Sequence, residues 1–237
     1  GDGDRPLISD EHGNWLRGDV AGILCADYLK VNAIATPISS NSAVEKLQRF
    51  DIVERTRIGS PFVISAMQRL QQDYDCVAGY EANGGFLLAS DVTLDGRTIT
   101  ALPTRDTLIV QLAILMFAGT HQMSISQLVA TLPQRFTYSD RLKNFPTELS
   151  QSKLALMTGG DFEVNKQVIG QTFGGEFGEV VGIDQTDGLR ITFDNQDVLH
   201  LRPSGNAPEL RCYSESASYR QAVNINRLCM DLLNAWL

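Results

Sequence analysis

The sequence predicts an α/β protein in which a three-layer α/β domain is followed by a smaller α+β domain. Through about residue 132, segments with helical periodicity alternate with short apolar segments, as in helices that cover a buried sheet. Residues 133–146 are polar and aromatic, which is typical of a connection between domains together with an edge strand. From about residue 161 the chain is rich in predicted strands, with glycines between them.

Start signals and apolar periodicity place the helices of the first domain. Serine and aspartate side chains accept backbone N–H groups at helix N-termini, and proline is favoured at the first helical position. We expect helices at residues 20–29 with Asp19 as the cap, 42–50 with a capping box from Ser42 to Glu45, 60–74 with Ser60 as the cap, 106–118, and from Ser124 onward. Apolar and β-branched runs predict strands at 28–38, 52–58, 76–80, 86–90 and 98–102, with a turn at Asp95-Gly96.

The second domain shows alternating segments and one helix. Strands are predicted at 180–183, 189–193, 197–201 and 209–214, with Thr186-Asp187-Gly188 as the hairpin turn between the first two. His200 alternates with apolar positions, and we expect it to be a structural residue at the surface. Ser218 is expected to cap the last helix, with Gln221 completing a capping box.

The composition argues against several classes of function. A net charge of −8 does not attract nucleic acid or an anionic membrane. No run of about eighteen apolar residues occurs, and the N-terminus lacks the basic and apolar regions of a signal peptide. The cysteines are widely spaced without a Cys-x-x-Cys pair, as in reduced thiols. We therefore expect a cytoplasmic protein that binds neither nucleic acid nor membrane.

The loop at residues 202–208 gathers hydrogen-bond donors between two predicted strands. Arg202 contributes a guanidinium, Ser204 a hydroxyl, Gly205 an open backbone and Asn206 an amide, and the loop has no carboxylate. An arginine fork with hydroxyl and backbone donors suits the oxygens of a phosphate. The alternative is a plain surface turn, because these residue types also favour turns for backbone reasons.

Three earlier loops also carry side chains suited to ligands. Asp2 and Asp4 alternate with glycines and could converge on Mg²⁺, or could belong to a frayed acidic terminus. Glu81 and Asn83, between glycines, offer the acceptors and donors that sugar hydroxyls need, or form a wide turn. Arg57 precedes a predicted helix N-terminus, where an anion would be stabilised.

Taken in order and rough spacing, these loops resemble the motifs of the α-D-phosphohexomutases, most of all the bacterial phosphomannomutases. The resemblance covers the whole chain, which is similar to the C-terminal half of such an enzyme. It implies that residues 1–18 end a truncated metal-loop domain and that residues 19–133 form the sugar-specificity domain. Residues 134–237 would form a phosphate-binding domain like the TATA-binding protein.

The resemblance also assigns roles to individual residues. It implies Mg²⁺ ligation by Asp2 and Asp4, with a further aspartate expected just before Gly1, and substrate binding by Arg5, Arg57, Glu81, Asn83, Arg202, Ser204, Gly205 and Asn206. Three positions depart from the family pattern. Asn206 replaces the usual threonine, Ala207 replaces a common glutamate, and Gly85 stands where many members have histidine.

The implied activity interconverts hexose 6-phosphate and hexose 1-phosphate, with mannose as the first choice, through a phosphoserine and a bisphosphate. The resemblance places the phosphoserine in the N-terminal half of the same enzyme, so the isolated chain is expected to be inactive. Two alternatives stay open: a non-catalytic sugar-phosphate-binding fragment, and a metal-dependent phosphatase that uses the Asp2–Asp4 loop.

Overall fold

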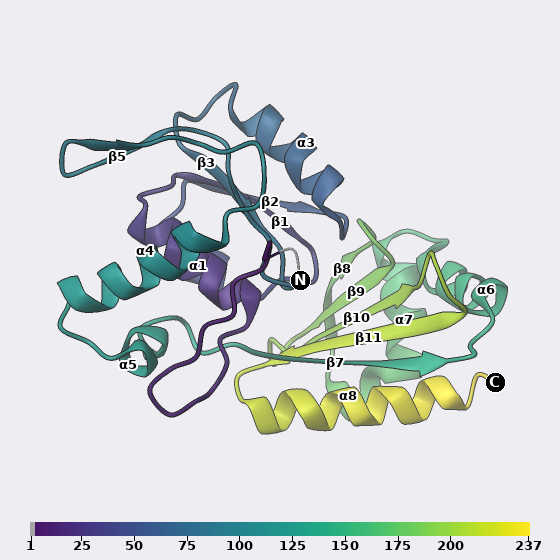
Figure 1. Cartoon of the computed structure of the whole chain (residues 1–237). Coiled ribbons are helices and arrows are strands. Elements are labelled where there is room, and N and C mark those ends of the chain that lie inside the picture. Colours follow the sequence, from purple (N-terminus) through teal and green to yellow (C-terminus); the bar gives the residue numbers. More distant parts are fainter. Residues whose placement is uncertain (1–2) are drawn as a thin grey trace. The chain divides into compact units, whose positions relative to one another are not determined.

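Residues 3–237 are described by a computed structural model (Figure 1). The chain divides into two units, Gly1–Pro133 and Gln134–Leu237, each with its own hydrophobic core. None of the helices in the described part has the length and apolar character that a membrane-crossing segment needs.

The first unit is built on a four-stranded sheet with the order β2-β1-β3-β4. Its strands are β1 (Ala33–Pro37), β2 (Ile52–Thr56), β3 (Val77–Tyr80) and β4 (Phe86–Leu88). β1 runs parallel to both β2 and β3, and β4 is antiparallel to β3. A separate hairpin of β5 (Val92–Leu94) and β6 (Arg97–Ile99) turns at Asp95-Gly96, where both residues have positive φ.

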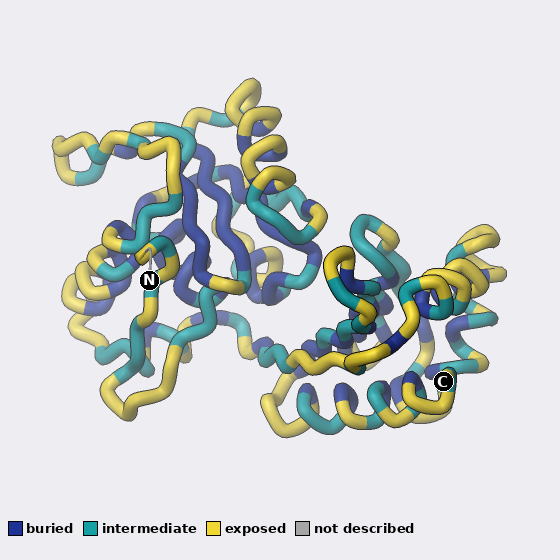
Figure 2. The backbone as a smooth tube through the Cα atoms, turned by 45° about the vertical axis from the view of Figure 1, so that its right-hand side comes forward, coloured by how far each residue is buried: buried dark blue, intermediate teal, exposed yellow. Residues whose placement is uncertain are grey.

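Helices cover both faces of this sheet, so the predicted three-layer α/β class is confirmed. They are α1 (Gly18–Tyr28), α2 (Ala43–Lys46), α3 (Ser60–Leu70), α4 (Thr107–Thr120) and α5 (Ile125–Ala130). Ile34 of β1 packs in the core with α1 and α4, whereas its neighbours Ala33 and Ala35 pack against α3. Successive strand residues point to opposite faces, so both faces of the fully buried β1 are packed, and its residues are apolar except for Thr36 (Figure 2).

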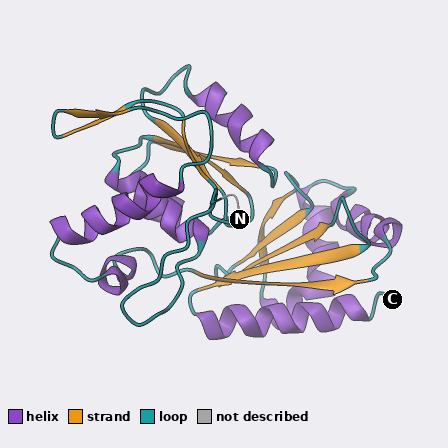
Figure 3. Ribbon diagram, viewed as in Figure 1, coloured by secondary structure: helices purple, strands orange, loops and turns teal. Residues whose placement is uncertain are grey.

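The second unit is a five-stranded antiparallel sheet with helices on one face (Figure 3). The sheet order is β7-β11-β10-β9-β8. Its elements are β7 (Phe136–Lys143), α6 (Thr147–Thr158), α7 (Phe162–Phe177), β8 (Val180–Asp184), β9 (Leu189–Phe193), β10 (Val198–Pro203), β11 (Glu209–Ser216) and α8 (Tyr219–Asn234). Leu199 and Leu201 face the helices, which leaves alternate residues such as Arg202 on the other face.

The expectation of strands from residue 161 is wrong for residues 162–177, which form α7. Asp161 caps this helix by accepting a bond from Val164 N, and Ile169, Phe173 and Phe177 form its core face. Gly170, Gly174 and Gly175 lie in the helix with open space beside each of them, and Gly178 is its C-cap. Tertiary packing of the aromatic face outweighs the low helix propensity of glycine.

Three predicted helix caps are also wrong. The N-cap of α1 is Arg17, and Asp19 is buried in the first turn, where it accepts bonds from Arg17 and from the backbone of Asn41. Ser42 makes no capping bond to α2, and α3 begins at Ser60 itself after Gly59, whose φ is +132°. A buried carboxylate or hydroxyl satisfies other backbone and side-chain groups here, which the sequence signal does not distinguish from capping.

The start signals at Ser124 and Ser218 are confirmed. Ser124 and Gln127 form a reciprocal capping box at α5. Ser218 accepts a bond from Gln221 N at α8, but the Gln221 side chain donates to Asp197 Oδ2 at 3.4 Å.

Candidate functional site

The loop after β3 folds tightly and buries a carboxylate. Glu81 N donates to Gly85 O at 2.9 Å, and Gly84 N donates to Glu81 O at 2.9 Å. Asn83 Oδ1 accepts from Gly85 N at 3.0 Å, while the Asn83 residue is exposed. Gly84 has φ +98°, a conformation that favours glycine. The loop therefore holds Glu81 inward and presents Asn83 to solvent.

An arginine that the sequence reasoning missed connects this loop to two other segments. Arg105 Nη2 donates to Glu81 Oε2 at 3.0 Å and also to Ser60 Oγ, and its Nη1 donates to Asp4 Oδ2 at 2.5 Å. Ser60 Oγ in turn donates to Glu81 Oε2 at 2.8 Å, so Ser60 serves the carboxylate and not the helix cap. The only sequence feature that could have pointed to Arg105 is its place directly before Asp106, the residue that caps the apolar helix α4.

Gly85 makes room for this arginine. A Cβ at position 85 would lie 2.6 Å from Arg105 Nε and 3.0 Å from its Cδ. A larger residue would therefore displace the guanidinium from Glu81. At Gly85, where the resemblance expects histidine, the Arg105 side chain fills the space beside the backbone in this chain.

The described part of the metal loop does not form a metal site by itself. Asp2 lies outside the described residues. The Asp4 carboxylate faces Arg105, and Arg5 Nε lies 3.9 Å from its other oxygen. The described residues contain no group of three or more His, Cys, Asp or Glu side chains that could hold a metal ion. Since Mg²⁺ needs several oxygen ligands, the residues present do not fit it unaided.

Arg57 is exposed at the end of β2, and its guanidinium lies 5.8 Å from the ring centroid of Phe62 on α3. This contact orients the arginine near the start of α3.

The loop at residues 202–208 closes between β10 and β11. Ser204 is buried and its N–H donates to Glu209 O at 2.8 Å, while Asn206 N lies 3.4 Å from Ser204 Oγ. Gly205 and Asn206 are exposed at the tip. Arg202 Nε donates to Asp187 Oδ2 at 2.7 Å, which joins the loop to the β8–β9 turn. The four predicted phosphate-loop residues thus lie together within this unit.

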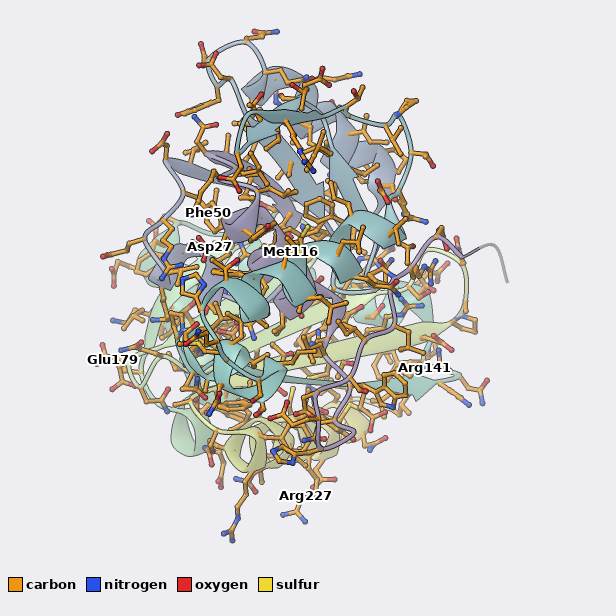
Figure 4. All side chains as sticks on the ribbon, turned by 60° about the vertical axis from the view of Figure 1, so that its left-hand side comes forward. Asp27, Phe50, Met116, Arg141, Glu179 and Arg227 are labelled. Atoms are coloured by element: carbon orange, nitrogen blue, oxygen red, sulfur yellow. The ribbon has the colours of Figure 1, made fainter. Side chains whose placement is uncertain are left out.

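Two further arginines lie beside Arg202 on the helix-free face. Arg202 pairs across the strands with Arg211, and Arg211 pairs with Arg141 of the edge strand β7 (Arg141 is labelled in Figure 4). Like charges directly opposite each other are destabilising. One carboxylate, Glu209, lies near two members of the row, at 3.4 Å from Arg141 Nη1 and 3.8 Å from the central Arg211 Nη2.

The arginine row borders a cavity of about 320 Å³ lined by Ser139, Asp140, Arg141, Arg211 and Tyr213. Arg211 Nε is buried and has no partner among the described residues. An unpaired buried N–H is costly, so the row favours an anion. The sequence reasoning missed both arginines, although the hairpin about the loop already places Arg211 opposite Arg202.

His200 is buried, which corrects the expectation of a surface residue. Its Nε2 donates to Asp187 O at 2.6 Å, and its ring stacks on Tyr213 at a centroid distance of 5.3 Å. Burial lowers the pKa of His200 to about 4, so the ring is neutral at pH 7. It supports the turn that carries Asp187.

These features define an α/β protein with a carboxylate loop in one unit and a loop beside a row of arginines in the other. Residues 17–136 match the description "Phosphoglucomutase/phosphomannomutase, alpha/beta/alpha domain III", and residues 152–231 match "Phosphoglucomutase/phosphomannomutase, C-terminal domain". The chain belongs to the phosphoglucomutase/phosphomannomutase family, as the resemblance indicated.

Curated relatives support this assignment. The chain is 51% identical to the phosphomannomutase of Salmonella muenchen over 95% of its own length and 46% of that protein. It is 42% identical to the phosphomannomutase of Sinorhizobium fredii over 99% of its length and 48% of that protein. The chain thus spans about half the length of the curated relatives it matches.

Solved structures show the same fold. A phosphoglucomutase/phosphomannomutase family protein of Burkholderia thailandensis matches all of this chain and 45% of its own, with a TM-score of 0.66 and 16% identity. The N-acetylphosphoglucosamine mutase of Aspergillus fumigatus, solved with GlcNAc-6P and magnesium, matches 98% of this chain and 50% of its own, with a TM-score of 0.62 and 15% identity.

Proposed function

We propose that this chain is the C-terminal part of a phosphohexomutase that interconverts hexose 6-phosphate and hexose 1-phosphate, with mannose as the hexose. The observation that carries the proposal is the 51% identity to a phosphomannomutase across nearly the whole chain. Residues 1–18 would then end the preceding domain, residues 19–133 would be the sugar-specificity domain, and residues 134–237 the phosphate-binding domain.

The second unit would bind the phosphate group that is not reacting. Arg202 uses only Nε for Asp187 among its described contacts, so its two terminal nitrogens remain for phosphate oxygens. Ser204, Gly205 and Asn206 would add a hydroxyl and backbone or amide donors from the loop tip. Arg211, with its unpartnered buried Nε, extends the positive surface beside Arg202. Such a donor set suits a doubly charged ester better than a neutral ligand.

The first unit would bind the sugar ring. Glu81 Oε2 is held by Ser60 and Arg105, which fixes the carboxylate and leaves Oε1 for a ring hydroxyl. Asn83 engages Oδ1 within its loop and keeps its amide nitrogen for a second hydroxyl. Arg5 and Arg57, both exposed, would add positive charge for the anionic substrate. Fixed acceptors and donors of this kind give specificity for hydroxyl orientation.

The proposed reaction begins at a phosphoserine in the part of the enzyme that this chain does not match. The serine O–P bond breaks while a P–O bond forms to a free sugar hydroxyl, whose proton passes to the serine oxygen. The bisphosphate then reverses its orientation, and its other phosphoryl group returns to the serine. The phosphate-binding loop must therefore accept either end of the sugar.

The proposal includes Mg²⁺, which offsets charge on transferring phosphoryl groups when bound. Asp2 and Asp4 are the candidates, and binding would have to release Asp4 from Arg105. We also propose a cytoplasmic location, which the four free cysteines support.

The test is a calorimetric titration of the chain with mannose 1-phosphate, comparing wild type with Arg202→Ala. Loss of a charge-assisted phosphate contact should weaken binding by about tenfold to a hundredfold. Arg227→Ala, at an exposed position of α8, is the matched control and should bind as the wild type does. Unchanged affinity of Arg202→Ala would show that its proposed role is wrong.

The alternatives differ in turnover. A binding fragment would bind the sugar phosphate without converting it, alone or joined to the N-terminal part. A phosphatase would release inorganic phosphate without forming the isomer. A mutase assay of the full-length protein, with phosphate release measured in parallel, separates the three.

A further inference from the structure

The outer face of α4 carries an exposed apolar surface. Leu108, Leu112, Leu115 and Met116 are 62%, 51%, 54% and 56% exposed (Figure 4, where Met116 is labelled). At about 100° per residue, these positions fall within an arc of roughly 100° on one side of the helix. We call these four side chains the α4 stripe.

The opposite side of α4 is already the core of the first unit. Ile109, Val110, Ala113, Ile114 and Phe117 are buried there. Residues 107–120 contain no charged side chain, so the helix is apolar on both sides. A helix that is apolar all round belongs in a buried place, and a continuous exposed apolar patch marks an interaction surface.

The last helix provides the comparison within the same chain. α8 buries Ile225, Cys229 and Leu233, whereas its exposed positions include Arg227 and Asp231. That is the ordinary pattern of a helix at a solvent-facing surface. Exposure of a helix to solvent therefore does not account for the apolar side chains of the α4 stripe.

The start of the described chain lies at the N-terminal end of α4. Thr107 Oγ1 donates to Gly3 O at 2.6 Å, and Arg105 donates to Asp4. Any polypeptide that precedes residue 3 would thus leave this unit beside Leu108, the first member of the stripe.

The relatives contain such a polypeptide. The matched regions are domain III and the C-terminal domain, and the match covers 46% of the Salmonella muenchen protein. The remainder of a protein built this way precedes domain III. A segment tethered beside a surface meets it at an effective concentration of the order of millimolar, so even modest apolar contacts suffice for docking.

We propose that the α4 stripe is the docking surface for the preceding part of the same polypeptide, through an apolar face on that part. Burial of leucine and methionine side chains supplies the attraction. The inference rests on the proposal that the chain is the C-terminal part of a longer enzyme, but it uses none of the residues assigned to the substrate.

The first test measures the accessibility of one stripe position. Leu115→Cys is introduced with Cys76→Ser, because Cys76 is the native cysteine that is not fully buried. Labelling by a maleimide is compared between the 237-residue chain and the full-length protein encoded by its gene. We expect labelling about tenfold slower in the full-length protein, because burial shields the thiol. Gln68→Cys, at an exposed position of α3, is the control and should label equally in both.

Two outcomes would overturn the proposal. Equal labelling of Leu115→Cys in both proteins would mean that the stripe stays exposed. Slow labelling in the 237-residue chain that quickens on dilution would assign the stripe to a second copy of the chain. A full-length protein without mutase turnover but with a protected cysteine would refute the proposed activity and leave this inference standing.

The second test measures whether the α4 stripe contributes to the stability of the full-length protein. Leu112→Glu with Leu115→Glu should shift the unfolding midpoint of the 237-residue chain by no more than about 2 °C, since both side chains are already exposed. In the full-length protein the same change should lower the midpoint by about 5 °C or more, because charges then enter a buried contact. Equal shifts in the two proteins would contradict docking.

Discussion

Lowering the pH should destabilise the second unit through His200, which lies beneath the turn that carries Asp187. Burial lowers its pKa to about 4, while the nearby Asp187 raises it and Arg190 and Arg202 lower it further. Protonation would bury a cation and add an N–H at Nδ1, an atom that has no partner among the described residues. The neutral ring is therefore strongly preferred in the folded state.

The magnitude follows from proton linkage. An unfolded histidine has an ordinary pKa near 6.5, so the folded protein binds fewer protons than the unfolded chain as the pH falls below it. The stability that the neutral His200 ring contributes is fully present above about pH 6.5 and is lost progressively as the pH falls toward 4. At pH 5 His200 is protonated in the unfolded chain but not in the folded protein. This difference lowers the free energy of unfolding by about 2 kcal/mol.

The assay is urea unfolding of the 237-residue chain at pH 7.5 and pH 5, followed by fluorescence of Trp236 in a Trp15→Phe background. Trp236 packs beside Phe173 in the second unit and so reports on that unit. His200→Gln keeps a donor for the Asp187 carbonyl but does not titrate, so it serves as the reference. Between pH 7.5 and pH 5, the free energy of unfolding should fall by about 2 kcal/mol more in the wild type than in His200→Gln. The same loss in both proteins would refute the reasoning.

Two further predictions test the packing of charged side chains. Gly85→Ala places a Cβ 2.6 Å from Arg105 Nε and should lower stability in thermal unfolding by about 1–3 kcal/mol, because it breaks the hydrogen bonds of Arg105. Gly119→Ala is the control, because a Cβ at this position meets open space, and it should be neutral or stabilising. A similar loss of stability in both variants would contradict the stated role of Gly85. Arg135→Ala removes one member of a buried ion pair and should cost about 3–5 kcal/mol in urea unfolding. Lys166→Ala breaks the more exposed Lys166–Glu179 pair and should lower stability far less, because solvent screens an exposed ion pair, so equal losses would show that burial does not set the cost.

Strands and hairpins of the second unit could be predicted because their period-2 alternation is a local signal. The turn at residues 186–188 and the strands on either side of the Arg202 loop were expected at nearly their observed places. Helix α7 was not, because its glycines argue locally for breaks and only the packing of Phe173 and Phe177 decides the helix.

The residues of the candidate site likewise fall into those that local sequence patterns predict and those that only the tertiary structure reveals. Glu81, Arg202 and Ser204 could be predicted as candidates because ligand-type side chains cluster within a few residues of each other in a loop. Arg105 and Arg211 were missed because their partners lie elsewhere in the chain. Arg105 meets Asp4 and Glu81 only when the sheet and α4 have formed. Arg211 becomes part of a positive row only through the register of β10, β11 and β7.

By itself the sequence determined the α/β class of the first unit, the family resemblance and the loops with donor groups, because periodicity and short motifs are properties of neighbouring residues. The tertiary structure alone decided which charges pair, that His200 is buried and neutral, and that α4 is apolar on both sides. Those properties depend on distances between residues far apart in the chain, and burial and charge pairing exist only once the backbone has brought such residues together.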